Sequence, residues 1–286
     1  MDSHAIPRPV KPPVTALLRD AAWQSGHSWI EGKLLTFLLT AQGLSSFMLI
    51  TLGVLCTKFG VARPVIRPMI RRQICRAGLH LLPMVVFLSG ALGFLVIGQT
   101  VSLLTQVGAT QYLGMVMVTA VVRELGPMLA ALLVLARVGA AHVIELATAR
   151  ALGEVEALEA LGIDPIHYLV VPRVVAMAVG VFSLTVYFIL GALLSGYLWA
   201  FLQDVPLTPG EYVHQIALAL RGMDFVLLGL KTSLFGVIIA TVTCYHGLAQ
   251  PLGLDGVSTA TIRAVTQSVV LCVLLDAFFI VIFLLI

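Results

Sequence analysis

Four ionisable side chains lie within long apolar stretches of the sequence, where a charge is costly. They are Arg123, Glu124, Lys231 and Asp276. A charge at the centre of a bilayer costs roughly 2.5–3.5 kcal/mol on insertion scales, so each needs a partner or a polar cavity. Two compatible interpretations follow: the cations pair with the carboxylates to join helices, or the four side chains line a substrate path. Pro127, close after Glu124, also predicts a kink or a local opening at this point.

The stretches that hold these charges are long enough to cross a membrane. The chain has 286 residues, of which 59% are hydrophobic and only 11% charged, and its mean hydropathy is +1.04. A span needs about 20 apolar residues, and it must be helical because lipid offers no partners to backbone polar groups. Five stretches qualify: 79–104, 113–135, 174–201, 226–245 and 269–286. We therefore expect an all-α integral membrane protein, and the net charge of +3 is too small to indicate a nucleic-acid partner.

Lysine and arginine are distributed unevenly among the connections. Six lie between residues 58 and 76, and Arg150, Arg173 and Arg263 mark two further basic connections, whereas the connection 203–224 holds only one basic residue. Basic residues mark cytoplasmic connections. We therefore expect the stretch 79–104 to run outward from the cytoplasm and the C-terminus to be periplasmic.

A sixth apolar stretch, 34–56, is diluted by polar residues and allows two interpretations. If it spans, the basic N-terminal residues lie outside, which is unfavourable; if it lies in the interface or re-enters, all ten basic residues up to Arg76 are inside. We favour the second interpretation, with a cytoplasmic N-terminus. The expected organisation is an N-terminal cytoplasmic and interfacial segment, 1–78, followed by a permease domain, 79–286, with five transmembrane helices.

The connection 145–173 contains a short acidic helix. Apolar residues follow one stripe of the segment 151–161, and its acidic residues lie elsewhere. Gly162 is placed to end this helix, and Asp164, before a proline, to cap the next one. Anionic headgroups would repel an acidic helix on the basic side of the membrane. A protein partner explains it better, although an ordinary solvated loop helix is the alternative.

The sequence lacks the motifs of a nucleotide-binding protein or a hydrolase. The GLKTS run at 229–233 lies inside an apolar stretch and lacks the rest of a phosphate-binding loop. His142 and Glu145, three residues apart, are expected to form a satisfied polar pair, not a metal site. The cysteines have no metal or disulfide spacing, and we interpret them as small buried hydrophobes: Cys56, Cys75, Cys244 and Cys272. We expect no metal and no cofactor.

The run 123–173 closely resembles the MlaE/YrbE permeases, the membrane subunits of MCE-type ABC transporters that move phospholipids between bacterial membranes. The shared order is RELGP at 123–127, an Arg-x-Gly-Ala step at 137–140, Glu145, the acidic helix, Asp-Pro at 164–165 and Pro-Arg at 172–173. The likeness continues more weakly from about residue 30 to the C-terminus. Ser258 departs from it, standing where the family favours glycine.

The resemblance implies a homodimeric permease of the inner membrane with one interfacial helix, five spans and a cytoplasmic coupling helix. The implied partners are a cytoplasmic ABC ATPase, a periplasmic MCE-domain protein and phospholipid. A small cytoplasmic accessory subunit is a further candidate partner. The coupling residues would be Glu154, Glu156, Leu158, Glu159 and Asp164. The four membrane charges would be substrate-binding, with Arg123 favoured for a lipid phosphate because its guanidinium offers two-pronged geometry.

An ion-coupled secondary transporter of a hydrophobic substrate is the alternative function. It would use Glu124, Lys231 and Asp276 as an ion relay within the membrane. A neighbouring gene for an ATPase with a phosphate-binding loop would favour the ABC permease.

Overall fold

The computed structural model describes residues 42–55, 63–109, 112–202, 208–248 and 256–285. The chain divides into two units, Met1–Phe47 and Met48–Ile286, and each is considered by itself. The described part of the apolar stretch 34–56 is the helix Gln42–Leu55. The remainder of this stretch lies outside the described residues, and its interfacial placement stays a prediction.

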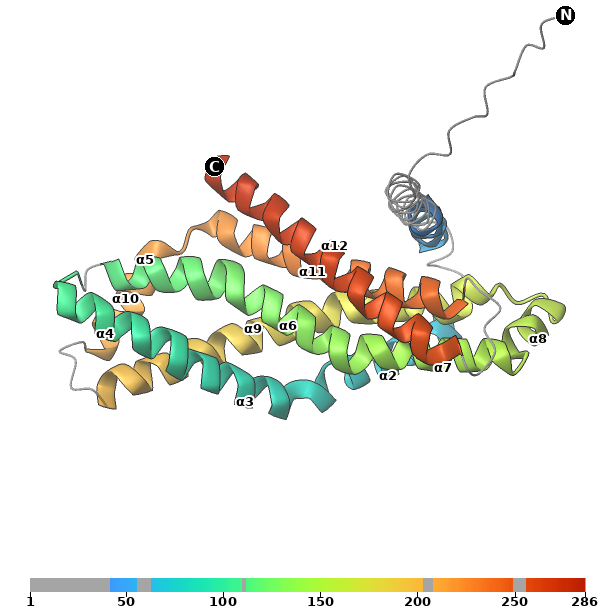
Figure 1. Cartoon of the computed structure of the whole chain (residues 1–286), viewed down its shortest axis with the longest axis horizontal. Helices are drawn as coiled ribbons and strands as arrows, with labels where there is room; N and C mark the ends of the chain where they lie inside the picture. The colour runs from blue at the N-terminus through green and yellow to red at the C-terminus, as the bar shows by residue number, and fades with distance from the viewer. Residues whose placement is uncertain (1–41, 56–62, 110–111, 203–207, 249–255, 286) are drawn as a thin grey trace, which may run out of the picture. The chain divides into compact units, whose positions relative to one another are not determined.

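Five long apolar helical stretches follow, in the number and order that the sequence predicts (Figure 1). They are Pro68–Val107, Leu113–Ala151, Ile166–Leu202, Gly222–Leu248 and Val257–Leu285. The described residues form helices and turns and contain no strand. The chain is therefore a multi-pass, all-α membrane protein.

Each of the first three stretches consists of several helical segments. The first begins within α2 (Arg63–Ala77) and continues through η1 (Leu79–Leu81), α3 (Leu82–Leu92), η2 (Gly93–Ile97) and α4 (Gly98–Val107). The second contains α5 (Leu113–Met117), η4 (Val118–Leu125), α6 (Gly126–Val134), η5 (Leu135–Gly139) and α7 (Ala140–Ala151). The third contains η6 (Ile166–Val170) and α9 (Val171–Leu202). The last two are single helices, α11 (Gly222–Leu248) and α12 (Val257–Leu285).

The first two stretches are longer than predicted. The first has 40 residues, which at about 1.5 Å per residue is about 60 Å, twice the thickness of the hydrocarbon layer. Its polar beginning, α2, continues the helical stretch beyond the apolar part and packs against α9. The division expected between residues 78 and 79 stays a prediction, while α2 belongs structurally with the spans that follow it.

In the described ranges, four π-helical segments widen the helices, and η4 matters most for the site. It ends at Leu125, directly before Gly126 and Pro127. The opening predicted next to Pro127 is therefore present as a π-helical segment. Such wide turns within α-helices are frequent at functional sites.

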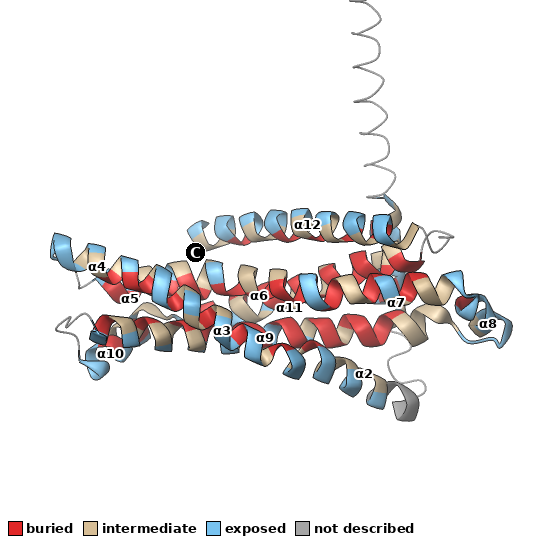
Figure 2. Cartoon of the chain, turned by 60° about the horizontal axis from the view of Figure 1, so that its bottom comes forward, coloured by how far each residue is buried: buried red, intermediate tan, exposed pale blue. Residues whose placement is uncertain are grey.

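The helix α12 lies on the other spans with one narrow face. The buried residues on that face are Ala260, Ala264, Ser268, Cys272 and Phe279, and they follow helical spacing. In the most apolar 18-residue segment of α12, only 17% is buried. Figure 2 shows the outer side of the helix exposed along its whole length. That side is apolar, as contact with lipid or with another apolar protein surface requires.

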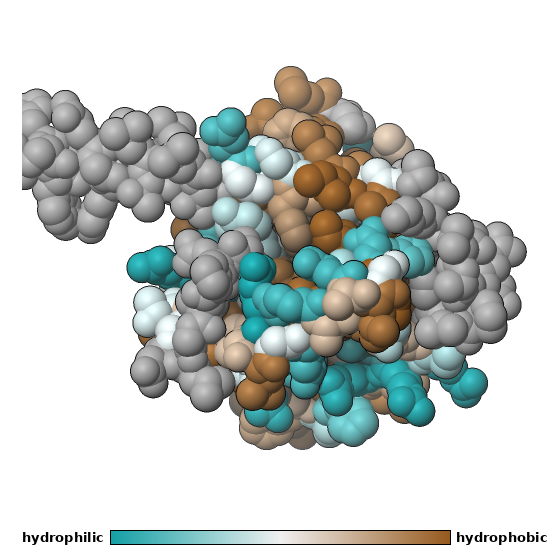
Figure 3. All heavy atoms as spheres, turned by 90° about the vertical axis from the view of Figure 1, so that its right-hand side faces the viewer, coloured by the Kyte–Doolittle hydropathy of each residue, from teal (hydrophilic) through white to brown (hydrophobic). Residues whose placement is uncertain are grey.

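The short helix α8 (Glu154–Ala160) lies at one end of the spans, where Figure 3 shows hydrophilic side chains gathered. The predicted helix 151–161 is too long, because α7 continues to Ala151 and Gly153 breaks the chain with φ +78°. Gly162, at φ +74°, ends α8 as expected. The Asp164 carboxylate accepts a hydrogen bond from Ile166 N at 3.1 Å, so it caps the next helix as predicted.

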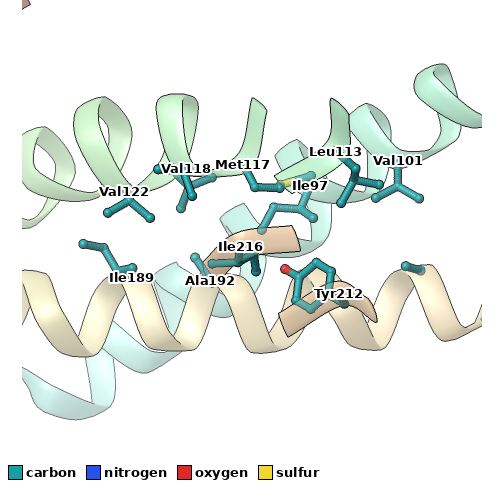
Figure 4. Packing of buried hydrophobic residues seen from close by; sticks show 12 residues of the cluster. Ile97, Val101, Leu113, Met117, Val118, Val122, Ile189, Ala192, Tyr212 and Ile216 are labelled. Carbon is teal, nitrogen blue, oxygen red and sulfur yellow. The ribbon is translucent and has the colours of Figure 1, made fainter. Parts of the chain in front are cut away.

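At the opposite end, α10 (Pro209–Ala219) inserts into the core between the second and third spans (Figure 4). Tyr212 and Ile216 pack there against Leu113 and Ala192, and Tyr212 Oη donates to Leu193 O at 3.1 Å. Burial raises the pKa of Tyr212. The connection after the third span is thus a packed helix.

A reciprocal hydrogen-bond pair begins α10. Thr208 Oγ1 accepts from Glu211 N, and the Glu211 carboxylate accepts from Thr208 N. These hydrogen bonds from Thr208 lower the pKa of the exposed Glu211.

The helices α9 and α11 approach closely at Gly236. A methyl group at this position would collide with the backbone of Met177 and Ala178. We predict that Gly236→Ala lowers the free energy of unfolding by about 1–3 kcal/mol through overpacking. The thermal midpoint of the purified protein in detergent measures it. Gly229→Ala in the same helix is the matched control, because its methyl would meet only Phe182 at 3.7 Å; equal midpoints for the two variants would contradict the prediction.

Candidate functional site: an ion-pair network between three spans

The segment η4 presents Arg123 and Glu124 between α11 and α12. Adjacent helical residues point roughly 100° apart, and these two side chains accordingly take different partners. The Arg123 Nη2 atom lies 3.0 Å from Asp224 Oδ2, and Lys231 Nζ lies 3.0 Å from Glu124 Oε2. Both partners are on α11, so the network joins the second span to the fourth.

Lys231 is the centre of the network, with a side chain only 1% exposed. Besides its bond to Glu124, Nζ lies 2.7 Å from Asp276 Oδ1 on α12, an ion pair whose angles do not fit a hydrogen bond. Nζ also donates to the carbonyl oxygen of Arg123 at 2.9 Å. This one ammonium therefore holds three spans together.

The bond from Lys231 to the Arg123 carbonyl has a local cause. In an α-helix this carbonyl would accept from the N–H of residue 127, but Pro127 has none. Lys231 supplies the missing donor. Pro127 and Lys231, more than 100 residues apart in the sequence, therefore act on the same carbonyl: the proline cannot donate to it, and the lysine does.

Asp224 is the member of the network that the sequence interpretation missed, because it was assigned to the connection 203–224. It lies in the first turn of α11, and its carboxylate accepts from Arg221 N at 2.9 Å. It precedes Lys231 by seven residues, which is two helical turns and therefore the same face. This spacing was the available signal.

The same spacing recurs on α12. Phe283 follows Asp276 by seven residues, and the Arg123 guanidinium lies 5.2 Å from the Phe283 ring centroid. The network thus has one layer of Arg123, Asp224 and Phe283 and another of Glu124, Lys231 and Asp276.

The two cations differ in what they can still bind. Lys231 is occupied on all sides, whereas the Arg123 side chain is 22% exposed and its Nε has no hydrogen-bond partner. The expectation that membrane cations pair with carboxylates is confirmed for Lys231 with Glu124 and Asp276. Contact of these residues with a substrate stays a prediction, and Arg123 is the cation with donors to spare.

A second ion cluster lies nearer α8. Glu145 accepts from Arg76 Nη1 at 2.6 Å and from Arg173 Nη2 at 3.3 Å, so it joins the first, second and third spans. The expected pair of His142 with Glu145 is wrong: both ring nitrogens of the buried His142 have no partner, because the arginines take the carboxylate. Cys75 is another correction, since it is exposed.

The other cysteines divide between buried and undescribed positions. Cys244 and Cys272 are buried as expected, and Cys56 lies outside the described residues. Within the described ranges, no group of three His, Cys, Asp or Glu side chains is placed to hold a metal ion.

Most of the residues expected to contact an ATPase are exposed at the surface. Glu154 and Glu159 are exposed, and Glu156 lies 3.9 Å from Arg150 in a weak pair. Val155 is the buried residue that anchors α8, while Leu158 is half-buried. The helix therefore presents its carboxylates outward.

Removal of the central cation tests the structural role of the network. Lys231→Met leaves two carboxylates and a carbonyl without their partner, and we predict a loss of about 3–5 kcal/mol in the free energy of unfolding. The thermal midpoint in detergent reports it. Glu124→Gln and Asp276→Asn added to Lys231→Met should recover at least half of the lost stability, because no unpaired charge remains. A triple variant less stable than Lys231→Met would argue against the ion-pair explanation.

Comparison with known proteins places this chain in a family. The family model described as "Permease MlaE" matches residues 70–282. A probable ABC transporter permease of Rickettsia felis is 33% identical over 236 residues, which cover 81% of this chain and 88% of the relative. A probable ABC transporter permease of Synechocystis is 34% identical, covering 60% of this chain and 65% of the relative. The chloroplast protein TRIGALACTOSYLDIACYLGLYCEROL 1 of Arabidopsis thaliana is 32% identical, covering 70% of this chain and 57% of the relative. The chain belongs to the MlaE permease family and is the permease subunit of an ABC transporter.

Proposed function

We propose that this permease moves a phospholipid, or a related lipid, between the bacterial inner membrane and a periplasmic MCE-domain carrier, and so serves the lipid asymmetry of the outer membrane. One relative carries the name of a galactolipid, trigalactosyldiacylglycerol, which supports a lipid substrate. A separate cytoplasmic ABC ATPase hydrolyses the ATP. Membership of an ABC permease family removes the reason to favour an ion-coupled secondary transporter.

The observation that carries the proposal is the Arg123 side chain, which lies within an apolar span and is 22% exposed. A lipid headgroup drawn out of the bilayer needs a cationic partner, and the Arg123 fork suits a phosphate. Asp224 and Phe283 hold this side chain in place and leave part of it exposed. Glu124, Lys231 and Asp276 complete the substrate-binding set by fixing the helix turn from which Arg123 extends.

The proposed assembly is a homodimer in the bacterial inner membrane. The N-terminus and α8 are cytoplasmic and the C-terminus is periplasmic, since the basic residues concentrate at the α8 side of the spans. The exposed apolar side of α12 suits burial in lipid or in a second copy. A small cytoplasmic accessory subunit is compatible with this arrangement.

The helix α8 is the proposed coupling helix. Its exposed carboxylates, Glu154, Glu156 and Glu159, would meet basic residues of the ATPase, and Leu158 would enter an apolar pocket. Asp164 fixes the turn that returns the chain to the third span.

The lipid contact is tested at Arg123. We predict that Arg123→Ala remains abundant and dimeric but co-purifies with several-fold less phospholipid, because the anionic headgroup loses its counter-ion. Mass spectrometry of lipids bound to the purified protein measures this. Arg221→Ala, a change of an exposed arginine nearby, should retain the lipid. If abundance and lipid decline in step for Arg123, Glu124, Lys231 and Asp276 variants alike, the network is structural and the lipid contact is refuted.

The coupling role is tested by charge reversal. Glu154→Lys together with Glu156→Lys should release the ATPase from the purified complex, because attraction becomes repulsion at the interface. The measurements are subunit stoichiometry and the stimulation of ATP hydrolysis. Glu211→Lys, an exposed charge reversal on α10, is the control and should keep the ATPase bound. Unchanged stoichiometry and stimulation in the double variant would exclude α8 as the docking element.

A further inference from the structure

A basic pocket of about 810 Å³ lies between the beginning of the first span and the η5–α7 part of the second. Its volume is within the range typical of small-molecule sites. Six of its lining residues are arginines or histidines: Arg71, Arg72, Arg76, Arg137, His80 and His142. None of the lining residues is acidic. The pocket is therefore strongly cationic.

The positive charge of this pocket is mostly unbalanced by the residues that the structure describes. Among the described residues, Arg76 is the lining arginine with a carboxylate partner, Glu145. Arg71, Arg72 and Arg137 are exposed and make neither an ion pair nor a hydrogen bond within that part of the chain. Like charges gathered beside a low-dielectric membrane repel one another unless an anion joins them.

His142 independently indicates a missing polar group. Its side chain is 1% exposed and lines the pocket, yet neither ring nitrogen has a hydrogen-bond partner. Buried polar atoms are almost always satisfied, and an unsatisfied one carries a desolvation penalty. A ligand oxygen in the pocket would satisfy it.

The position of the pocket separates it from the ion-pair network. Arg137 follows Arg123 by 14 residues, which is about 21 Å further along the span toward α8. The arginines of α2 lie on the polar beginning of the first stretch, which is longer than the hydrocarbon layer requires. Exposed apolar side chains, among them Leu79 and Phe87, follow on the same stretch. The pocket thus adjoins the boundary between a polar, basic segment and an apolar surface suited to acyl chains.

We propose that this pocket binds the phosphate of an anionic glycerophospholipid headgroup in the cytoplasmic leaflet, at a site separate from Arg123. The cytoplasmic placement rests on the proposed function. Arginine guanidinium groups bind phosphate oxygens in pairs, and basic pockets between spans on the cytoplasmic side suit anionic headgroups. The adjoining apolar surface favours a lipid over an acidic protein segment. The permease would then hold lipid at two levels, at the cytoplasmic headgroups and at the membrane depth of Arg123.

The exposed Cys75 lines the pocket and reports its occupancy. Cys244 and Cys272 are buried, so in a Cys56→Ser background a maleimide reacts chiefly at Cys75. The experiment measures the ratio of alkylation rates of the detergent-purified protein without and with dihexanoyl phosphatidylglycerol. Inorganic phosphate at matched ionic strength, dihexanoylglycerol and purified ATPase are added separately as the other arms. We expect saturable protection by the phosphatidylglycerol, weak protection by phosphate and none by the uncharged lipid or the ATPase.

Variants then assign the protection to the pocket. Arg71→Gln, Arg72→Gln and Arg137→Gln together should weaken it at least about tenfold, since each lost charge-assisted hydrogen bond costs roughly that factor. Arg263→Gln, which removes an arginine outside the pocket, should leave protection unchanged. Arg123→Ala should also leave it unchanged, so that failure at one lipid site is distinguishable from failure at the other.

Four results would overturn the proposal. They are no protection of the wild-type chain by phosphatidylglycerol, equal protection by inorganic phosphate, protection by the ATPase alone, and unaltered protection in the triple variant. The wild-type measurements decide the matter even if the triple variant fails to fold.

Discussion

The ammonium of Lys231 is the group on which the packing of this permease depends most. A cation that is 1% exposed within an apolar helix must find all its partners inside the protein. It finds them on two other spans, as the carboxylates of Glu124 and Asp276 and the backbone carbonyl of Arg123. The relative rotation of three helices is therefore fixed by one side chain. This arrangement fixes the helical turn that carries Arg123. Asp224 and the Phe283 ring then hold the Arg123 side chain.

The π-helical segment η4 and the close packing of α9 with α11 place the network where it is. The widened segment η4 ends before Gly126 and Pro127, and Pro127 has no N–H for the carbonyl of Arg123, which accepts from Lys231 instead. Gly236 allows α11 to approach the backbone of α9. The second ion cluster, around Glu145, joins the first three spans closer to α8. Two polar clusters at different depths thus connect spans whose remaining contacts are largely apolar.

Hydropathy predicted the five spans and the membrane charges, because both depend on local composition. It did not predict where the helices begin and end, since α2 begins before the apolar part of the first span and α7 continues after that of the second. The role of Asp224 was missed, and the pairing of His142 with Glu145 was wrong, for a different reason. The partners of Asp224 and Glu145 come from residues 101 and 69 positions away, and only tertiary packing decides such pairings. Cys75 is exposed because it lies on the polar α2, and the basic composition of residues 58–76 was the signal that could have shown it.

The order of the ion pairs along the chain has a consequence for biosynthesis. Glu124 precedes Lys231 by 107 residues, so its carboxylate is already in the membrane when the ribosome delivers α11 to the insertion machinery. Insertion of an isolated helix that carries a lysine costs roughly 2.5–3.5 kcal/mol. The carboxylate of Glu124, already inserted, reduces this cost by pairing with Lys231. Asp276 arrives last, on α12, and its arrival completes the coordination of the ammonium. Synthesis of α12 is then the step that completes the ion-pair network.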